Sequence, residues 1–211
     1  MVQVLNRGSN EAPGRFQRRS EAQRLRILRA AARVFRRLGL SATGMRDIAE
    51  EADLSPGILY YYFRGRDEIL LFCQERTLER LLATAERARE GGGTHAERLQ
   101  ALLRAHVHCV LDELEGATAH LEVESLPEGL RAPVVEKRDL YEHAVRSLVV
   151  EGMEQGEFSP ADAALVTRAM LGAVNWTVRW YQRGGPQSVD EIADSLSAYL
   201  VRGLHSARDA E

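Results

Sequence analysis

The sequence predicts an all-α protein with a small three-helix head on a larger helical body, about nine helices in all. Apolar residues recur along most of the chain at the spacing of one helix face. No segment shows the alternation of apolar and polar residues that indicates a strand. Only six of the 211 residues are proline and 45% are hydrophobic, so the chain has enough apolar surface to bury a core.

The helices are bounded by residues that start or end them. The first is expected over about Ser20 to Leu38, and Gly39 ends it because glycine readily adopts the left-handed backbone that closes a helix. Two short helices follow within residues 43–66. Further helices are expected over about 66–89, 96–114, 117–126, 131–155, 160–182 and 189–204. The expected domains are a flexible basic arm at 1–19, a head at 20–65 and a body at 66–211.

The segment 43–66, TGMRDIAEEADLSPGILYYYFRGR, predicts two short helices joined by a tight turn. Thr43 can cap the first helix with its hydroxyl, and Asp53 tolerates the left-handed backbone of a turn. Ser55 can cap the second helix, where Pro56 suits the first position because its missing N–H costs little there. The second helix then carries a glycine and three consecutive tyrosines, so it is thin on one side and able to hydrogen-bond on another.

Such a helix pair is a shape with which proteins enter the DNA major groove, the second helix reading base edges. Ile58, Leu59 and Phe63 are expected to hold this second helix against the rest of the head. The alternative interpretation is a generic helical hairpin with a packed aromatic edge.

The formal net charge of −3 hides a strong asymmetry. Residues 1–66 contain thirteen arginines and six acidic residues, which gives +7, and the remainder carries −10. A positive end on an acidic protein suits a polyanion such as DNA, while the acidic body stays away from the phosphates. A solvated basic face is the alternative. The helix pair lies in the same positive segment, and this combination favours DNA binding.

Several other classes of protein are disfavoured. No apolar run approaches the roughly 20 residues of a membrane span, and the N-terminus lacks the apolar stretch of a signal peptide. Cys73 and Cys109 are expected to be buried thiols in a reducing cytoplasm. His106 and His108 lie two positions apart, so on a helix they point about 200° apart and cannot chelate one ion. With no nucleophile–base arrangement, phosphate-binding loop or zinc spacing, we expect no enzyme, no cofactor and no metal site.

The order and spacing of these features resemble the TetR family of bacterial one-component repressors. Asp53 stands where that family usually has glycine, and Arg66 stands where it usually has lysine. The resemblance implies a homodimer on a pseudo-palindromic operator, with a ligand pocket in each body. The residues that carry it lie within 24–71: Phe35, Gly39, Thr43, Arg46, Asp47, Ile48, Ala49, Ala52, Leu54, Ser55, Gly57, Leu59, Tyr60, Phe63, Glu68 and Leu70.

The resemblance also implies DNA contacts, position by position. Thr43 and Arg46 would touch phosphates, as would Tyr60 and Tyr62, and Arg66 would clamp the DNA backbone. Phosphate contacts set the register, and only base contacts specify sequence. The residues expected to face base edges are Ser55, Pro56, Gly57, Leu59 and, as the aromatic contact, Tyr61.

In the body, the stretch 169–178, AMLGAVNWTV, is apolar on nearly all sides, and such a helix is buried all round. We expect its own core to cover one side and a partner subunit the other, so that two helices of each subunit form a four-helix interface. An ordinary monomeric core is the alternative. The interface residues expected are Met170, Val174, Leu196, Tyr199, Leu200 and Gly203.

The ligand prediction depends on a looser resemblance. The segment 152–158, the Asn175-Trp176 and Trp180-Tyr181 pairs and Gly184-Gly185 resemble the acyl-CoA-responsive branch of the family, which controls fatty-acid, phenylacetate or sterol-ring degradation. Trp176 and Trp180 lie one helical turn apart and would wall an apolar channel. An arginine on the helix face shared by Arg168, Asn175 and Arg179 would bind a CoA phosphate. The expected ligand contacts are His106, Tyr141, Asn175, Trp176, Arg179 and Trp180.

Alternatives remain for each of these residues. The tryptophans suit core or dimer packing, the arginines suit ion pairs with nearby acids, and the histidines suit ordinary satisfied polar positions. The sequence therefore predicts a dimeric repressor that an acyl-CoA releases from DNA. One rival is a repressor of the same fold that senses a hydrophobic drug or a free fatty acid. Another is a helical protein-interaction module that binds no DNA.

Overall fold

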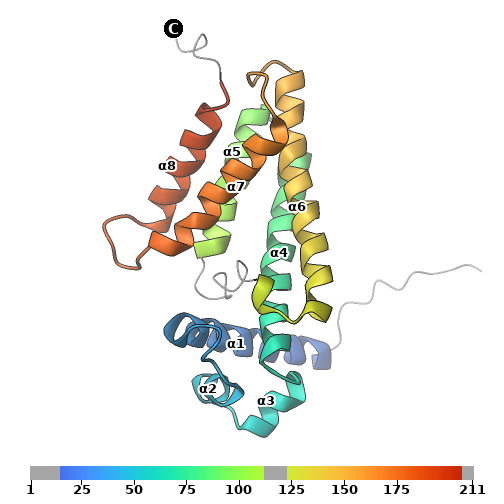
Figure 1. Ribbon diagram of the computed structural model, residues 1–211, viewed down its shortest axis with the longest axis vertical. Coiled ribbons are helices and arrows are strands. Elements are labelled where there is room, and N and C mark those ends of the chain that lie inside the picture. The colour runs from blue at the N-terminus through green and yellow to red at the C-terminus, as the bar shows by residue number, and fades with distance from the viewer. Residues whose placement is uncertain (1–14, 112–122, 206–211) are drawn as a thin grey trace, which may run out of the picture.

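The computed structural model describes residues 15–111 and 123–205, and within them the chain forms eight α-helices, one short 3₁₀ turn and no strand (Figure 1). The all-α prediction is confirmed. The elements in chain order are α1 (Arg15–Leu38), α2 (Met45–Glu51), α3 (Pro56–Tyr62), α4 (Arg66–Glu90), α5 (His95–Leu111), η2 (Val123–Ser125), α6 (Glu128–Glu154), α7 (Ala163–Trp180) and α8 (Val189–Arg202).

Two expected segments differ from the structure. Residues 15–19 belong to α1 and not to an arm, because they contain no glycine or proline and arginine and glutamine favour a helix. The rest of the expected arm, 1–14, lies outside the described residues. The helix expected over 117–126 lies mostly outside them too, and its described end is the turn η2. The Arg131 guanidinium, early in α6, fixes this turn by donating to the carbonyl oxygens of Leu126 and Glu124, each at 2.7 Å.

The head consists of α1, α2 and α3. In Figure 1, α1 crosses the lower end of α4, and α2 and α3 lie on the side of α1 that faces away from the body. Apolar side chains from the three helices and from the first turn of α4 form one buried cluster, which fixes how α3 is held. Its members include Ile27, Leu28, Ala31, Val34, Phe35, Ile48, Ala49, Leu59, Phe63 and Leu70.

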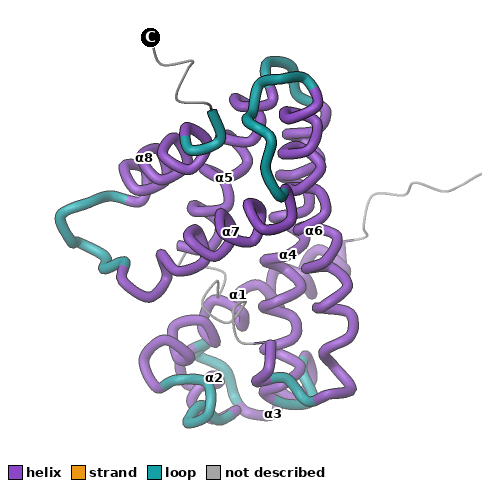
Figure 2. The backbone as a smooth tube through the Cα atoms, turned by 45° about the horizontal axis from the view of Figure 1, so that its top comes forward, coloured by secondary structure: helices purple, strands orange, loops and turns teal. Residues whose placement is uncertain are grey.

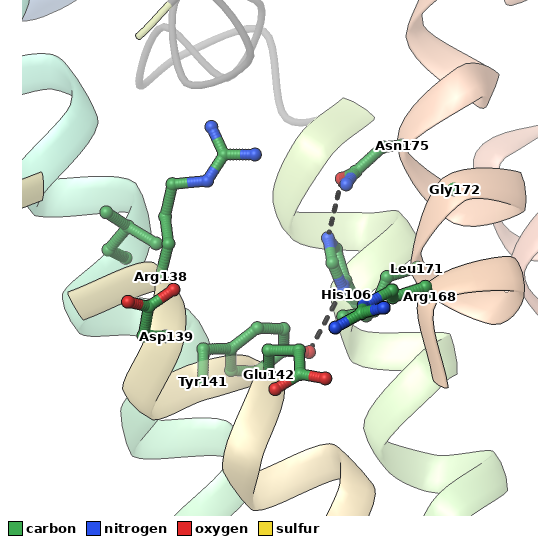
Figure 3. Close-up of a pocket in the computed structure, with 10 residues that line it drawn as sticks. His106, Arg138, Asp139, Tyr141, Glu142, Arg168, Leu171, Gly172 and Asn175 are labelled. Atoms are coloured by element: carbon green, nitrogen blue, oxygen red, sulfur yellow. Dashed lines mark hydrogen bonds between the residues drawn. The ribbon is translucent and has the colours of Figure 1, made fainter. Parts of the chain in front are cut away.

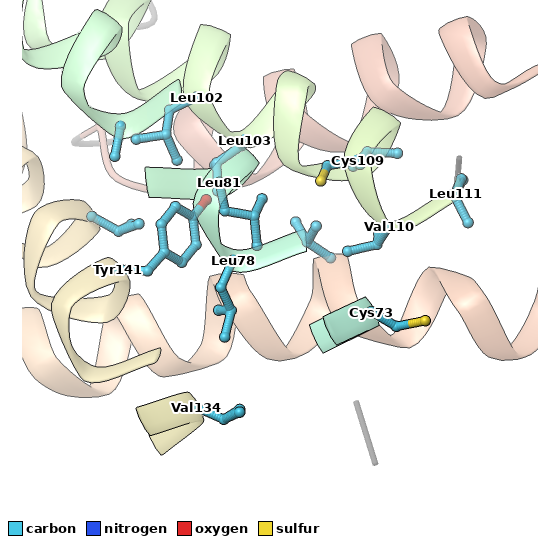
Figure 4. Close-up of a cluster of buried hydrophobic side chains, with 14 of the residues drawn as sticks. Cys73, Leu78, Leu81, Leu102, Leu103, Cys109, Val110, Leu111, Val134 and Tyr141 are labelled. Atoms are coloured by element: carbon cyan, nitrogen blue, oxygen red, sulfur yellow. The ribbon is translucent and has the colours of Figure 1, made fainter. Parts of the chain in front are cut away.

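The body consists of α4 to α8. α4 lies against α5 and α6, and α5 lies against α7 and α8 (Figure 2). Leu78 and Leu81 of α4, Leu102 and Leu103 of α5 and Tyr141 of α6 meet in the body core (Figure 4). In the described part of the chain, no helix is long and apolar enough to cross a membrane. Because α4 runs without a break from the head into this core, it is the element that joins the two.

The turn that follows α6 has a structural role. Gly152 lies against the Phe158 ring so closely that a Cβ at this position would sit 2.2 Å from Cε2 of that ring. Gly156 adopts a φ of 73°, which glycine does without strain. The Glu157 carboxylate accepts the Ala96 N–H at 3.1 Å and lies 2.7 Å from Nδ1 of His95. The segment 152–158 therefore joins the end of α6 to the start of α5.

Candidate functional site

The turn between α2 and α3 has the predicted geometry. Asp53 is the one non-glycine residue with positive φ, 54°, among those that the structure describes. The Ser55 hydroxyl oxygen accepts the Ile58 N–H at 3.3 Å, and Pro56 is the first residue of α3. The cap and the left-handed turn residue are therefore confirmed, and together they set where α3 begins.

α3 presents a continuous exposed surface. Its most exposed aromatic residue is Tyr61, with 73% of its surface accessible, followed by Tyr60 with 54%. Tyr62 is partly buried and meets the Tyr61 ring edge-on, with ring centroids 5.1 Å apart. Aromatic and small residues therefore share the side of α3 that faces solvent. The exposed residues, here called the α3 surface, are Ser55, Pro56, Gly57, Ile58, Tyr60 and Tyr61.

Two predictions for α3 are wrong. Leu59 is fully buried in the head core, so it cannot face base edges. Ile58 is 47% exposed, so it does not hold the helix against the head. Both errors have one cause: the helical period places Leu59 and Phe63, four residues apart, on the packed side and turns Ile58 away from it.

The prediction for Thr43 is also wrong. Thr43 is buried, and its hydroxyl donates to the Gly39 carbonyl oxygen at 2.7 Å, so it is neither the cap of α2 nor exposed to a phosphate. The N-cap of α2 is Gly44, whose N–H donates to the Asp47 carboxylate at 2.7 Å. Arg46, in the first turn of α2, is exposed and remains available for a phosphate.

The joint between head and body is formed by charged and aromatic side chains. The Arg24 guanidinium of α1 lies 4.5 Å from the ring centroids of both Phe63, at the end of α3, and Phe72 of α4. Cations over aromatic faces attract the ring quadrupole. Arg66 donates to the Leu40 carbonyl oxygen at 2.9 Å and pairs with Asp67 at 3.0 Å. The predicted DNA clamp Arg66 therefore has partners within the chain, and a phosphate contact stays a prediction.

A pocket of about 300 Å³ lies in the body among α4, α5, α6 and α7 (Figure 3). Three of the expected ligand contacts line it: His106 from α5, Tyr141 from α6 and Asn175 from α7. Its volume is at the lower end of the range for small-molecule sites. The described residues that line it are Leu78, His106, Arg138, Asp139, Tyr141, Glu142, Arg168, Leu171, Gly172 and Asn175.

The deep wall of the pocket is a hydrogen-bonded, uncharged group of side chains. The Tyr141 hydroxyl lies 3.0 Å from Nδ1 of His106, and Nε2 of His106 lies 3.1 Å from Oδ1 of Asn175. Burial lowers the pKa of His106 to about 4, although its bond to Asn175 acts in the opposite direction. Burial also raises the pKa of Tyr141 far above its ordinary value. At neutral pH both groups are therefore neutral.

The rim of the pocket is charged. Arg138, Asp139 and Glu142 come from α6, and Arg168 comes from α7, with the two arginines on opposite sides of the cavity (Figure 3). Arg168 and Asp139 are exposed, so the pocket opens toward solvent on this side. These α6 residues were not predicted from the sequence, although their spacing from Tyr141, within one helical turn, is the signal that would have found them.

The other three expected ligand contacts are not in the pocket lining. Trp176 is 63% exposed and Trp180 is 46% exposed, so the prediction that they wall a channel is wrong. They lie on the outward side of α7, whereas Val174 and Thr177 lie on its buried side. Arg168, two turns before Asn175, lines the pocket, whereas Arg179, one turn after Asn175, does not.

The expected dimer residues fall into two groups. Met170 and Val174 are buried within the single chain, so they cannot contact a partner and that part of the prediction is wrong. Tyr199 is 72% exposed and Gly203 is also exposed, while Leu196 and Leu200 are partly buried. Large apolar side chains also face solvent from α7, so a partner would meet other residues of this helix than those predicted. They are Leu165, Trp176 and Trp180.

The two histidines of α5 have different surroundings, as the helical period predicts. His106 faces the pocket, whereas Nε2 of His108 lies 3.3 Å from the Asp190 carboxylate of α8. Throughout residues 15–111 and 123–205, no group of three or more His, Cys, Asp or Glu side chains is placed to hold a metal ion. Cys73 and Cys109 are buried free thiols, as expected.

Two family models match the chain. The model described as bacterial regulatory proteins, tetR family, matches residues 27–72. The model described as tetracyclin repressor-like, C-terminal domain, matches residues 92–204, which is more than half of the chain. The gap between the two matches, residues 73–91, covers most of α4 and begins just after the head–body joint.

Curated relatives match over most of their length. The HTH-type transcriptional repressor KstR2 of Mycobacterium tuberculosis is 28% identical over 186 residues, which cover 87% of this chain and 93% of KstR2. The fatty acid metabolism regulator protein of Bacillus subtilis is 22% identical over 185 residues, which cover 86% of this chain and 95% of that protein.

Solved structures share the fold. The TetR family regulator PfmR from Thermus thermophilus superposes with a TM-score of 0.78 at 32% identity, covering 86% of this chain and 100% of PfmR. The ketosteroid transcriptional regulator KstR2 of M. tuberculosis gives 0.79 at 26% identity, covering 87% and 95%. AibR, solved in complex with isovaleryl coenzyme A and operator DNA, gives 0.73 at 22% identity, covering 85% and 98%, and at that identity indicates the fold alone.

Proposed function

Because the chain belongs to the TetR family of bacterial transcriptional regulators, whose members bind operator DNA as dimers and respond to a small-molecule effector, we propose that an acyl-CoA thioester releases this repressor from its operator. The genes it controls would serve fatty-acid or aromatic-acid degradation, and it would act in the cytoplasm, where bacterial DNA lies. The observation that carries the effector proposal is the pocket, which combines an uncharged buried wall with arginines on its rim.

The DNA side of the proposal is supported by the α3 surface. Tyr60 and Tyr61 project from the exposed side of a short helix whose first residues, Pro56 and Gly57, are also exposed. The segment 1–66 that contains this surface carries +7, and the rest of the chain carries −10. The head is therefore the end of the molecule that a DNA backbone attracts, and α3 is its most exposed aromatic element.

The effector side is supported by the chemistry of the pocket. An acyl-CoA has an apolar chain, a neutral thioester and a highly charged nucleotide end. The cavity of about 300 Å³ is large enough for the chain and thioester but not for the whole molecule. Arg138 and Arg168 at the rim would then meet phosphate groups that stay outside, and arginine binds phosphate with a bidentate geometry.

The relatives point to related chemistry. One is described as a regulator of fatty acid metabolism, another as a ketosteroid regulator, and AibR has been solved with isovaleryl coenzyme A. These descriptions belong to those proteins. They support the class of effector proposed here and leave acyl length to experiment.

The link between pocket and head is α4. Leu78 of α4 lines the pocket, and Lys137 of α6, beside the lining residue Arg138, pairs with Glu75 and Glu79 of α4 at 3.2 and 3.1 Å. The first turn of the same helix holds the head through Arg66. A ligand that separates α6 from α4 would change the spacing of the two heads in the dimer. It can do so only by its different affinity for the two states.

The test is a titration of the operator complex. Fluorescently labelled DNA from upstream of the gene is bound by the protein, and anisotropy is followed during addition of acyl-CoA thioesters, free CoA and the matching free acids. We expect a salt-sensitive complex that thioesters dissociate at lower concentration than either other class. Equal release by free acids would instead favour a fatty-acid or drug sensor. Failure to form any salt-sensitive complex would favour the protein-interaction module.

A pair of variants sharpens this test. Arg168→Ala removes a rim arginine and should raise the thioester concentration required for release. Arg87→Ala removes an exposed arginine of α4 that bonds to Thr84 and lies outside the pocket lining. It serves as the matched control for the loss of one positive charge. If both variants shift the release curve equally, the rim arginine has no specific role.

A further inference from the structure

Three helices meet at the deep wall of the pocket through a chain of hydrogen bonds. Tyr141 from α6 contacts Nδ1 of His106 from α5, and Nε2 of His106 contacts Oδ1 of Asn175 from α7 (Figure 3). His106 and Tyr141 are buried, and Asn175 lies at the cavity surface. This relay is here called the Tyr141–His106–Asn175 chain.

The direction of the protons in this chain follows from its chemistry. A neutral imidazole carries one N–H and one acceptor nitrogen. Burial keeps both the imidazole and the phenol uncharged at neutral pH. Within the described residues, the Tyr141 hydroxyl is hydrogen-bonded to Nδ1 of His106. A buried phenol proton without an acceptor would be costly, so the hydroxyl donates to Nδ1. The His106 proton is then on Nε2, which donates to Oδ1 of Asn175.

This arrangement fixes the orientation of the Asn175 amide. Its oxygen is occupied by His106, so its NH₂ group, with two donors, is the part left for the cavity. Both imidazole nitrogens are engaged and Oδ1 of Asn175 keeps only one lone pair, so the amide NH₂ is the main hydrogen-bonding group that these three side chains offer to the cavity. A ligand group that accepts finds a fixed donor.

Resting on the proposed function, we propose that the NH₂ group of Asn175 recognises the carbonyl oxygen of the effector, so that the pocket distinguishes a thioester from a thioether of the same length. The Tyr141–His106 pair acts as the positioning group, since it holds the amide in one orientation. The Arg138 and Arg168 side chains lie at the rim and contribute equally to both compounds. Carbonyl recognition is therefore separate from binding of the charged end.

The experiment compares matched ligands in direct binding. Butyryl-, hexanoyl- and octanoyl-CoA are each paired with the S-alkyl-CoA of the same chain length, which lacks the carbonyl oxygen. Isothermal titration calorimetry of the DNA-free protein gives both dissociation constants. We expect the wild type to bind each thioester roughly fivefold more tightly than the thioether of the same length, which is the ratio of dissociation constants that corresponds to one net hydrogen bond.

The variants separate the donor from the chain that orients it. Asn175→Asp keeps the acceptor for His106 but removes the donor, and the preference should disappear. Tyr141→Phe keeps the Asn175 donor but no longer fixes which nitrogen of His106 carries the proton. The amide is then less strictly oriented, and the preference for the thioester should fall only in part. Gln182→Glu makes the same amide-to-acid change at an exposed position outside the pocket lining and should keep the wild-type ratio. Thermal unfolding confirms that each variant is folded.

Each outcome decides a different point. Equal affinity of the wild type for thioester and thioether overturns carbonyl recognition while leaving the acyl-CoA effector in place. A preference that survives in Asn175→Asp also overturns it. If no CoA compound binds at all, the proposed effector fails, and carbonyl recognition fails with it. A ratio that falls in Asn175→Asp and is kept in Gln182→Glu supports the assignment.

Discussion

The Arg66 guanidinium donates a hydrogen bond to the carbonyl oxygen of Leu40 at 2.9 Å, so the first turn of α4 holds the loop that precedes α2. The two residues are 26 positions apart in sequence. Because α4 also lines the pocket through Leu78, this bond joins a pocket-lining helix to the DNA-binding head. Arg66 is thus a residue through which a shift of α4 would reach the head.

Replacing Arg66 should reduce the coupling between the two sites. Arg66→Ala is expected to lower the free energy of unfolding by about 1 kcal/mol, because a partly exposed charge-assisted hydrogen bond is lost. It should also reduce the factor by which effector weakens operator binding, measured as the ratio of operator dissociation constants with and without thioester. Arg66→Lys keeps the charge but not the forked geometry and should give an intermediate value. An unchanged ratio in Arg66→Ala would show that coupling takes another route.

Tyr61 tests the assignment of the DNA-reading surface. Since it is 73% exposed, Tyr61→Ala should leave the unfolding temperature nearly unchanged. It should weaken operator binding by about tenfold if the ring contacts a base edge. Tyr61→Phe, which keeps the ring and removes the hydroxyl, should retain most of the affinity. Wild-type affinity in the alanine variant would place the reading surface elsewhere on the head.

Gly152 tests the packing at the end of α6. Gly152→Ala places a methyl group in the position occupied by the Phe158 ring and should destabilise the protein by about 2 kcal/mol through overpacking. Gly129→Ala, in the same helix but with open space around it, is the control and should be neutral or slightly stabilising. Chemical denaturation measures both. A second change, Phe158→Leu, should recover part of the loss, and no recovery would mean that the Phe158 contact is not the cause.

His106 gives the fold a dependence on pH. The pKa of His106 is about 4 in the folded protein and about 6.5 in the unfolded chain. Between these two pH values the unfolded state therefore binds a proton that the folded state does not bind. Stability should therefore fall as the pH is lowered from about 6.5 to about 4, by at most about 3 kcal/mol. His106→Gln cannot titrate, and its stability should fall less over this window. Parallel curves for the two proteins would contradict the buried neutral imidazole.

The head could be predicted largely from the sequence because its features are local. Ser55, Pro56 and Asp53 each act on the backbone within a few residues, and the structure has them in the expected roles. The prediction that Thr43 caps α2 was wrong for a reason that is equally local, because Gly44 and Asp47 form a competing cap one residue later. Sequence alone does not decide between two adjacent caps when both are chemically competent.

The pocket could be predicted only in part because it depends on how four helices are rotated. His106 and Asn175 are polar residues among mostly apolar neighbours, a pattern visible in the sequence, whereas Tyr141 follows a charged stretch. Trp176 was misplaced because an apolar side chain on a nearly all-apolar helix carries no sign of which side faces solvent. The choice of Arg168 over Arg179 likewise depends on where α6 crosses α7.

The proposed switch requires that effector and operator each weaken the binding of the other. Both effects can be measured as changes in dissociation constant. The thioester dissociation constant is determined by calorimetry with the free protein and with the saturated operator complex. Binding energies are reciprocal, so the operator should weaken thioester binding by the same factor by which the thioester weakens operator binding. We expect these two factors to be equal and well above one. A thioester that binds equally well with and without operator would contradict the proposed switch, because it could not then drive release.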